Sequence, residues 1–173
     1  MKRDVVIAGI GPGAEAQMTL ALVDVCEQAD VLIGAGRMTK AVEKYQKPML
    51  AEYSPEKIYE YLKAHPEYEK IVLLQSGDVG FYSGAKKLKE ALADYPLRFI
   101  CGISSGVYFA SKLQTSWDDM LLTSMHGRSL NLLDALKKSG KVFTLASDAK
   151  SIRELADFLL ELSLIHISEP TRP

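Results

Sequence analysis

The stretch VVIAGIGPG at residues 5–13 decides the fold of this chain. Its first six residues form a continuous apolar run, which is typical of a strand buried on both faces of a parallel sheet. The glycines that follow end the strand. Helical spacing at residues 18–28 and a short apolar run at residues 31–33 come next. The order is therefore strand, helix, strand, which predicts an α/β fold.

Two more buried strands are predicted at residues 71–74 and 97–100, and each leads into a loop of small residues and then a helix. Three of the predicted strands thus end in loops rich in glycine or serine. In an open α/β sheet, ligands bind outside the carboxyl ends of the strands. We therefore expect residues 1–113 to form an N-terminal lobe with a mainly parallel sheet and a ligand site at that edge.

The pattern changes after residue 113, where a polar segment is followed by short strands and helices. We expect residues 114–163 to form a partial, mixed α/β C-terminal lobe. Residues 164–173 carry two prolines and no periodicity, so we expect a non-native tail that packs poorly or makes intermolecular contacts. The apolar stretches at 142–145 and 155–162 would then lack cover, which favours a homodimer.

Composition excludes several classes of function. The 173 residues carry 21 Lys and Arg against 22 Asp and Glu, a net charge of -1, so no broad cationic field would hold nucleic acid by its phosphates. Apolar runs are too short for a membrane span or a signal sequence, and we expect a soluble, cytoplasmic protein. Cys26 and Cys101 lie far apart without a Cys/His cluster, so we expect buried apolar cysteines, no disulfide and no metal site.

The first loop formally matches the dinucleotide fingerprint G-x-G-x-x-A at residues 9–14. That fingerprint needs an acidic residue after the second strand, whereas Asp30 precedes it. Pro12 also lacks the backbone N–H that would face a pyrophosphate. A nicotinamide-dependent oxidoreductase therefore stays only as an alternative, beside the simpler interpretation of a glycine-rich turn without a ligand.

The second loop, at residues 76–83, combines backbone groups, one carboxylate and two aromatic rings. Asp78 suits a cationic centre and Phe81 suits an adenine-like ring. The alternative is that Asp78 only caps the following helix.

Three motifs together resemble the tetrapyrrole (corrin/porphyrin) methylases: GIGPG at 9–13, GDVGFYS at 77–83 and GISS at 102–105. WDD at 117–119 and SMHGR at 124–128 narrow the resemblance to the branch that methylates carbon 5 of a corrin precursor in cobalamin biosynthesis. The resemblance implies a two-lobed enzyme, usually a homodimer, that transfers a methyl group from S-adenosylmethionine to this tetrapyrrole.

The resemblance also implies the site residues. Those that would line the S-adenosylmethionine site are Pro12, Ser76, Gly77, Asp78, Phe81, Ser104 and Ser105. The loop with Gly9, Gly11 and Gly13 would face the tetrapyrrole.

Three further residues are candidates from their own chemistry. Arg37 and Arg128 can pair with substrate carboxylates through bidentate bonds or be plain surface charges. His126 is the candidate base for removing a proton from the methylated intermediate, although a turn histidine can instead satisfy a backbone carbonyl.

Two departures from the family pattern leave alternatives open. Ser76 and Val79 stand where family members usually carry a small residue and a proline beside the aspartate, and family members continue beyond the equivalent of Leu162. The alternatives are a truncated, non-catalytic fragment, a diphthine synthase and a ribosomal RNA methylase. A separate subunit for methylation at carbon 15 and decarboxylation is also left open.

Overall fold

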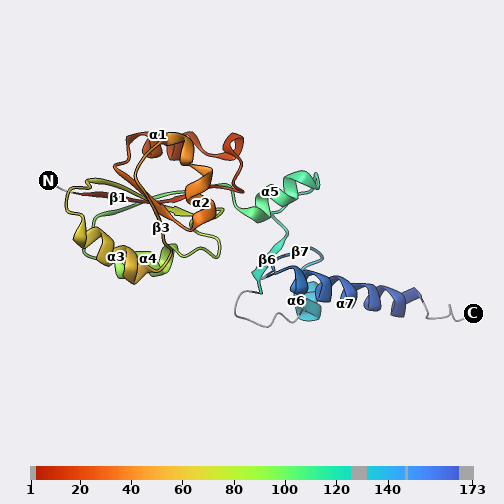
Figure 1. Cartoon of the computed structure of the whole chain (residues 1–173). Helices are drawn as coiled ribbons and strands as arrows, with labels where there is room; N and C mark the ends of the chain where they lie inside the picture. Colours follow the sequence, from red (N-terminus) through yellow and green to blue (C-terminus); the bar gives the residue numbers. More distant parts are fainter. Residues whose placement is uncertain (1–2, 126–131, 147, 168–173) are drawn as a thin grey trace, which may run out of the picture. The chain divides into compact units, whose positions relative to one another are not determined.

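The computed structural model describes residues 3–125, 132–146 and 148–167 (Figure 1). The chain divides into two compact units, Met1–Thr115 (unit 1) and Ser116–Pro173 (unit 2).

Unit 1 is built on a sheet of five parallel strands. Their order is β3 (Met49–Ala51), β2 (Val31–Gly34), β4 (Lys70–Gln75), β1 (Asp4–Gly9) and β5 (Leu97–Ile100). The predicted α/β fold with a mainly parallel sheet is confirmed. Strand β1 pairs with β4 on one side and β5 on the other, so the loops after these three strands leave from the same edge.

Helices cover both faces of this sheet, α1 (Leu20–Gln28) and α2 (Gly36–Ala41) on one and α3 (Pro55–Ala64) and α4 (Ala85–Ala91) on the other (Figure 1). Short 3-10 turns follow β1 at Glu15–Gln17 and α2 at Glu43–Tyr45. The side chain of Thr19 caps α1 by accepting from the N–H of Leu22, and Ser54 with Pro55 starts α3 as the sequence predicts.

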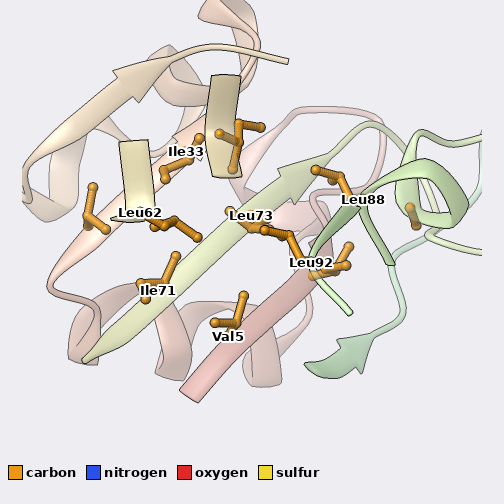
Figure 2. Packing of buried hydrophobic residues seen from close by; sticks show 11 residues of the cluster. Val5, Ile33, Leu62, Ile71, Leu73, Leu88 and Leu92 are labelled. Carbon is orange, nitrogen blue, oxygen red and sulfur yellow. The ribbon is translucent and has the colours of Figure 1, made fainter. Parts of the chain in front are cut away.

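Each face of the sheet has its own apolar core. Beneath α3 and α4, Leu73 of β4 and Leu62 of α3 are buried in the cluster that Figure 2 shows. Under α1 and α2, Leu22 and Cys26 are buried with Leu74 of β4. The continuous apolar runs of β1, β2 and β4 thus supply both cores at once, because alternate side chains point to opposite faces.

Two features of the sheet differ from the sequence prediction. Strand β3 was not expected, since it is a run of only three residues with a mostly exposed burial pattern. Strand β5 was expected to be buried, but Arg98 and Phe99 are exposed because β5 pairs only with β1 in the described sheet. Because β1 lies between β4 and β5, the loop after β1 leaves the sheet between the loops after these two strands.

Helix α5 (Ser105–Lys112) completes unit 1, separated from β5 by residues 101–104. Its N-cap is Ser104, whose hydroxyl accepts from the N–H of Val107 at 3.3 Å. The start of α5 is thereby fixed beside the loop after β5.

Unit 2 contains a parallel pair of strands, β6 (Leu121–Ser124) and β7 (Val142–Leu145), and two helices, α6 (Leu132–Lys138) and α7 (Ala149–Ile167). Helix α7 extends to Ile167, whereas the sequence pattern placed its end near Ser163. The first four residues of the expected tail are therefore helical, and residues 168–173 lie outside the described part.

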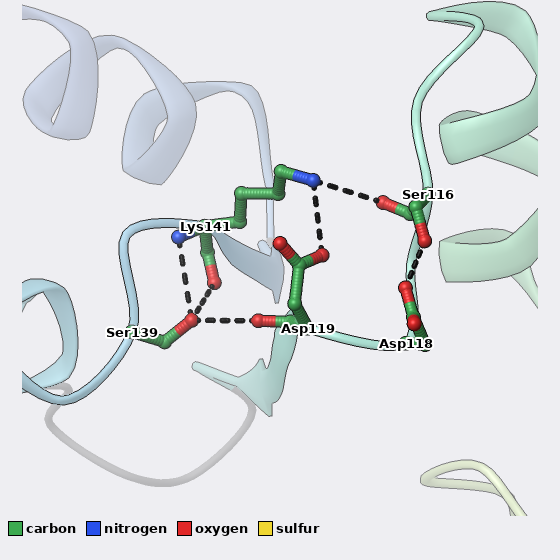
Figure 3. A network of polar contacts seen from close by, with 5 residues as sticks. All are labelled: Ser116, Asp118, Asp119, Ser139 and Lys141. Atoms are coloured by element: carbon green, nitrogen blue, oxygen red, sulfur yellow. Dashed lines mark hydrogen bonds and ion pairs between the residues drawn. The ribbon is translucent and has the colours of Figure 1, made fainter.

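Polar contacts join the segments that precede β6 and β7 (Figure 3). The Lys141 ammonium lies 2.9 Å from Oδ1 of Asp119, and the Ser139 hydroxyl lies 2.9 Å from the Asp119 carbonyl oxygen. The N–H of Leu121 also donates to the Lys141 carbonyl at 2.9 Å. These contacts set the register in which the two strands begin.

Candidate functional site

Three loops meet at the carboxyl edge of the unit 1 sheet. They follow β1, β4 and β5 at residues 10–14, 76–84 and 101–104. Gly11 and Gly77 exchange two backbone hydrogen bonds, each 3.0 Å long, so the first two loops pair directly. The N–H of Ile10 donates to the Gln75 carbonyl at 2.8 Å.

Glycines allow the three loops to touch through their backbones. A Cβ on Gly9 would lie 2.4 Å from the Gly77 carbonyl oxygen, and a Cβ on Gly102 would lie 2.2 Å from the same atom. Gly11 and Gly77 also adopt positive φ angles of 70° and 65°, which L side chains rarely take. The contact between Gly9, Gly77 and Gly102, called here the glycine junction, therefore requires glycine at all three positions.

Asp78 lies within this arrangement and uses both carboxylate oxygens. Oδ1 accepts from the N–H of Gly102 at 3.0 Å, and Oδ2 accepts from the N–H of Gly80 at 2.7 Å. Helix α4 begins only at Ala85, with Gly84 as its N-cap. The alternative that Asp78 caps the following helix is therefore wrong.

Arg37 lies beside the second loop. It belongs to α2, which follows β2, the neighbour of β4, and its Nη2 donates to the Ser76 hydroxyl at 2.8 Å. Of the other arginines in unit 1, Arg3 donates to the carbonyls of α3 residue Leu62 and of His65, while Arg98 pairs with Asp4 at the start of β1. Arg37 is thus the arginine of unit 1 that stands at the carboxyl edge.

The aromatic and serine candidates surround the same edge. Phe81 contacts Tyr82 edge to face, with ring centroids 5.0 Å apart, and its N–H donates to the Asp78 carbonyl at 3.2 Å. Ser104 uses its hydroxyl as the N-cap of α5, and Ser105 is the first residue of that helix. Phe81, Ser104 and Ser105 are all partly exposed, so each presents surface at this edge.

The first loop exposes fewer of its candidates than the resemblance implies. Gly9 and Gly11 are buried, and their place in the structure is explained by the packing of the loops. Pro12 is exposed, and Gly13, with a φ of 108°, has open space where a side chain would stand. Two candidates, His126 and Arg128, lie outside the described residues.

Asp30 lies at the opposite end of the sheet. Its Oδ2 accepts from the N–H groups of Glu69 and Lys70, both at 2.8 Å, where β4 begins. These bonds lower the pKa of the Asp30 carboxyl below its usual value. Asp30 therefore links β2 to β4 at their amino ends. It does not lie at the carboxyl end of β2, where the dinucleotide fingerprint requires an acidic residue.

The two cysteines differ from one another. Cys26 is buried in the core under α1, and burial raises the pKa of its thiol to about 12. Cys101, expected to be buried, is exposed beside Gly102 because it follows the edge strand β5. Within the described ranges, no three His, Cys, Asp or Glu side chains gather as metal ligands would.

Sequence reasoning missed the contacts that organise this edge, namely the bond from Gly102 to Asp78 and the bond from Arg37 to Ser76. Both cross many residues of sequence, and no local pattern marks them. The signal that was present is a glycine at or within two residues of the carboxyl end of β1, β4 and β5, namely Gly9, Gly77 and Gly102, because glycine permits close approach of backbones.

Comparisons with known proteins agree on one family. The profile of the tetrapyrrole (corrin/porphyrin) methylases matches residues 4–172. A probable cobalt-precorrin-7 C(5)-methyltransferase from Methanocaldococcus jannaschii is 33% identical over 162 residues, covering 89% of this chain and 75% of that protein. The cobalt-precorrin-7 C(5)-methyltransferase of Salmonella typhimurium is 28% identical, covering 87% of this chain and 74% of that protein.

Solved structures support the same fold. The cobalamin biosynthesis precorrin-6Y methylase of Archaeoglobus fulgidus matches with a TM-score of 0.59 at 19% identity, over 72% of this chain and 64% of that one. The uroporphyrin-III-C-methyltransferase of Thermus thermophilus matches with a TM-score of 0.64 at 20% identity, over 75% of this chain and 64% of that one. This chain thus spans about two thirds of these structures. On the profile match and the relative from M. jannaschii, the chain belongs to the tetrapyrrole (corrin/porphyrin) methylase family.

Proposed function

We propose that this protein is an S-adenosylmethionine-dependent C-methyltransferase that methylates carbon 5 of a corrin precursor, precorrin-6Y or cobalt-precorrin-7, in cobalamin biosynthesis. The names of the relatives from M. jannaschii and S. typhimurium support the substrate. The observation that carries the proposal is the meeting of three glycine-containing loops at one edge of a parallel sheet, where ligands bind in open α/β folds.

The groups at this edge fit an adenosyl ligand. They are backbone amides and carbonyls, serine hydroxyls and the Phe81 ring, a set that can hold the polar edges of a base and pack against its face. The space beside Gly13 leaves the first loop open to approach. We place the methyl donor against Pro12, Ser76, Gly77, Phe81, Ser104 and Ser105, with Asp78 in the same loop.

When bound, S-adenosylmethionine supplies a methyl group on a positively charged sulfur. Transfer of that group to a ring carbon needs an in-line approach more than acid or base assistance, so orientation supplies much of the rate. The chain's contribution is then a fixed backbone, because the glycine junction and the Gly11–Gly77 pairing hold the loops close together.

Arg37 is the proposed substrate carboxylate partner in unit 1. Tetrapyrrole precursors carry carboxylate side chains, and a guanidinium binds a carboxylate with two parallel bonds. The Ser76 hydroxyl accepts one N–H of Arg37 and so orients the group at the correct edge. Gly13, of the loop proposed to face the tetrapyrrole, has open space beside it. Arg128 as a second partner and His126 as the proton acceptor remain proposals from the family resemblance.

We also propose a cytoplasmic homodimer that works with a separate protein for methylation at carbon 15 and decarboxylation. The relative from Sinorhizobium is named a precorrin-6Y C(5,15)-methyltransferase [decarboxylating], and this chain covers 22% of it at 35% identity. Because this chain matches only one part of a protein named for methylation at carbons 5 and 15, a separate protein for the reaction at carbon 15 is supported. None of the helices in the described ranges is long and apolar enough to cross a membrane. Light scattering showing only the 19.1 kDa species would contradict the dimer.

Calorimetric titration with S-adenosylhomocysteine tests the proposal first. Saturable binding at one site per chain is expected, and no binding would overturn the assignment. Methyl transfer is then measured by mass spectrometry on precorrin-6Y and cobalt-precorrin-7, with elongation factor peptide and ribosomal RNA as substrates of other family members. Methyl transfer only to the elongation factor peptide or to ribosomal RNA would show that the substrate is not a corrin precursor.

Arg37→Ala should raise the KM for the corrin substrate, and Arg37→Lys should recover only part of the loss because lysine cannot form the paired bonds. Arg98→Ala is the matched control, since Arg98 pairs with Asp4 away from the site. An unchanged KM in Arg37→Ala would remove Arg37 from the substrate site.

A further inference from the structure

We infer that Asp78 is a positioning residue for the methyl-donor site and that its carboxylate does not contact the positively charged sulfur of the donor. This inference rests on the proposed function and deepens it. It replaces the simpler expectation that the one carboxylate of the second loop neutralises the cationic centre of the ligand.

The carboxylate of Asp78 links two loops that the sheet itself does not join. Strands β4 and β5 are separated by β1, so no ladder hydrogen bonds run between them. The bond from the N–H of Gly102 to Oδ1, at 3.0 Å, crosses this gap. The second and third loops are therefore held together by a side chain that reaches over the glycine junction.

The other carboxylate oxygen fixes the second loop internally. Oδ2 accepts from the N–H of Gly80 at 2.7 Å, which closes a tight turn two residues long. A Cβ on Gly80 would lie 3.0 Å from this oxygen, so the close approach suits glycine. The N–H of Phe81 donates to the Asp78 carbonyl at 3.2 Å, so the turn also places the residue whose ring is proposed to pack on the ligand.

Both oxygens of Asp78 are thus turned toward backbone amides. Amide donors compensate a carboxylate, and hydrogen bonds to a charged acceptor are about twice as strong as neutral ones. A carboxylate held by one donor on each oxygen has its orientation fixed by its own loops, and turning it toward a ligand would break both bonds. Asp78 therefore acts on the ligand through the positions of Gly102, Gly80 and Phe81.

Binding of two ligands that differ in charge separates positioning from direct contact. S-adenosylmethionine carries a positive sulfur, whereas S-adenosylhomocysteine is neutral and otherwise nearly identical. In Asp78→Asn and Asp78→Ala, positioning predicts that both ligands lose affinity by the same factor, roughly tenfold or more for alanine. Direct contact predicts a larger loss for the charged ligand, and a change in the affinity ratio beyond about threefold would overturn the inference.

Asp24→Asn is the matched control, because Asp24 is exposed on α1 and the same charge is removed without touching the loops. Both affinities should stay at the wild-type values in this variant. An affinity ratio that changes in Asp78→Asn by more than about threefold beyond its change in Asp24→Asn would overturn the inference.

Amide exchange in the ligand-free wild-type protein tests the same hydrogen bonds even if the Asp78 variants do not fold. The N–H groups of Gly102 and Gly80 should exchange slowly compared with that of Gly13, and both should exchange faster in Asp78→Asn. Fast exchange at Gly102 and Gly80 in the wild-type protein would overturn the inference. Failure of the wild-type protein to bind either ligand would instead overturn the proposed function, while the exchange result would still decide the placement of Asp78.

Discussion

Gly102→Ala is expected to lower the free energy of unfolding of unit 1 more than a surface substitution would. The added Cβ would lie 2.2 Å from the Gly77 carbonyl oxygen and 2.6 Å from the Gly9 carbonyl oxygen, both backbone atoms that cannot rotate away. The loops must therefore separate by about 1 Å, and overpacking of this kind costs about 1–3 kcal/mol. The same movement weakens the bond from Gly102 to Asp78, which brings the expected loss to about 2–4 kcal/mol.

Urea unfolding followed by far-ultraviolet circular dichroism measures the loss, and amide exchange in β1 and β4 assigns it to unit 1. Gly36→Ala is the matched control, because a Cβ on Gly36 meets no atom within 4 Å and the residue starts α2. That variant should be unchanged or slightly more stable, since alanine loses less backbone entropy than glycine. Equal stability of Gly102→Ala and Gly36→Ala would refute the close packing of the three loops.

Three further outcomes are expected. Thr19→Ala should destabilise α1 by about 1 kcal/mol in the same urea experiment, because its side chain accepts from the first turn of the helix, and an unchanged midpoint would refute the cap. Cys101 should react with iodoacetamide in the native protein while Cys26 reacts only after unfolding, as mass spectrometry of the labelled peptides would show, since Cys26 is buried with a pKa raised to about 12. The hydrogen bonds from Arg98 lower the pKa of the Asp4 carboxyl, so this pair stabilises the fold above the usual value of 3.8 and loses that contribution as the pH falls through the lowered pKa. Asp4→Asn should therefore lose less stability than the wild-type protein on acidification, as measured by thermal melting across pH. An equal loss in both proteins would show that the pair does not contribute.

The central strands of unit 1 could be predicted from sequence because burial on both faces leaves a continuous apolar run. Strands β1, β2 and β4 have such runs, and each was placed within two residues of its observed bounds. The edge strands are different. Strand β3 was missed because Met49–Ala51 is only three residues long and mostly exposed. Leu97–Ile100 was correctly predicted as a strand but wrongly as a buried one, because Phe99, which is 46% exposed, looks like a core residue in the sequence.

The order of the strands was also beyond the sequence pattern. Chain order suggests that the third and fourth predicted strands are neighbours, but β1 is inserted between β4 and β5. This insertion brings the first loop between the other two and creates the glycine junction. The strand order therefore explains why Gly9 and Gly11 are buried and closely packed, which the sequence pattern does not show.

Asp78 shows why the candidate site could be located but not understood from sequence. Its neighbourhood of glycines and an aromatic residue marked the loop correctly as part of the carboxyl edge. What the carboxylate does depends on Gly102, 24 residues away, and on a strand order that only the folded chain fixes. The same local sequence fits a carboxylate that contacts a cationic ligand and a carboxylate that ties two loops together. Only the direction in which the Asp78 oxygens point distinguishes these two roles. That direction is toward the amides of Gly80 and Gly102, which makes backbone placement, and not charge, the contribution of this residue.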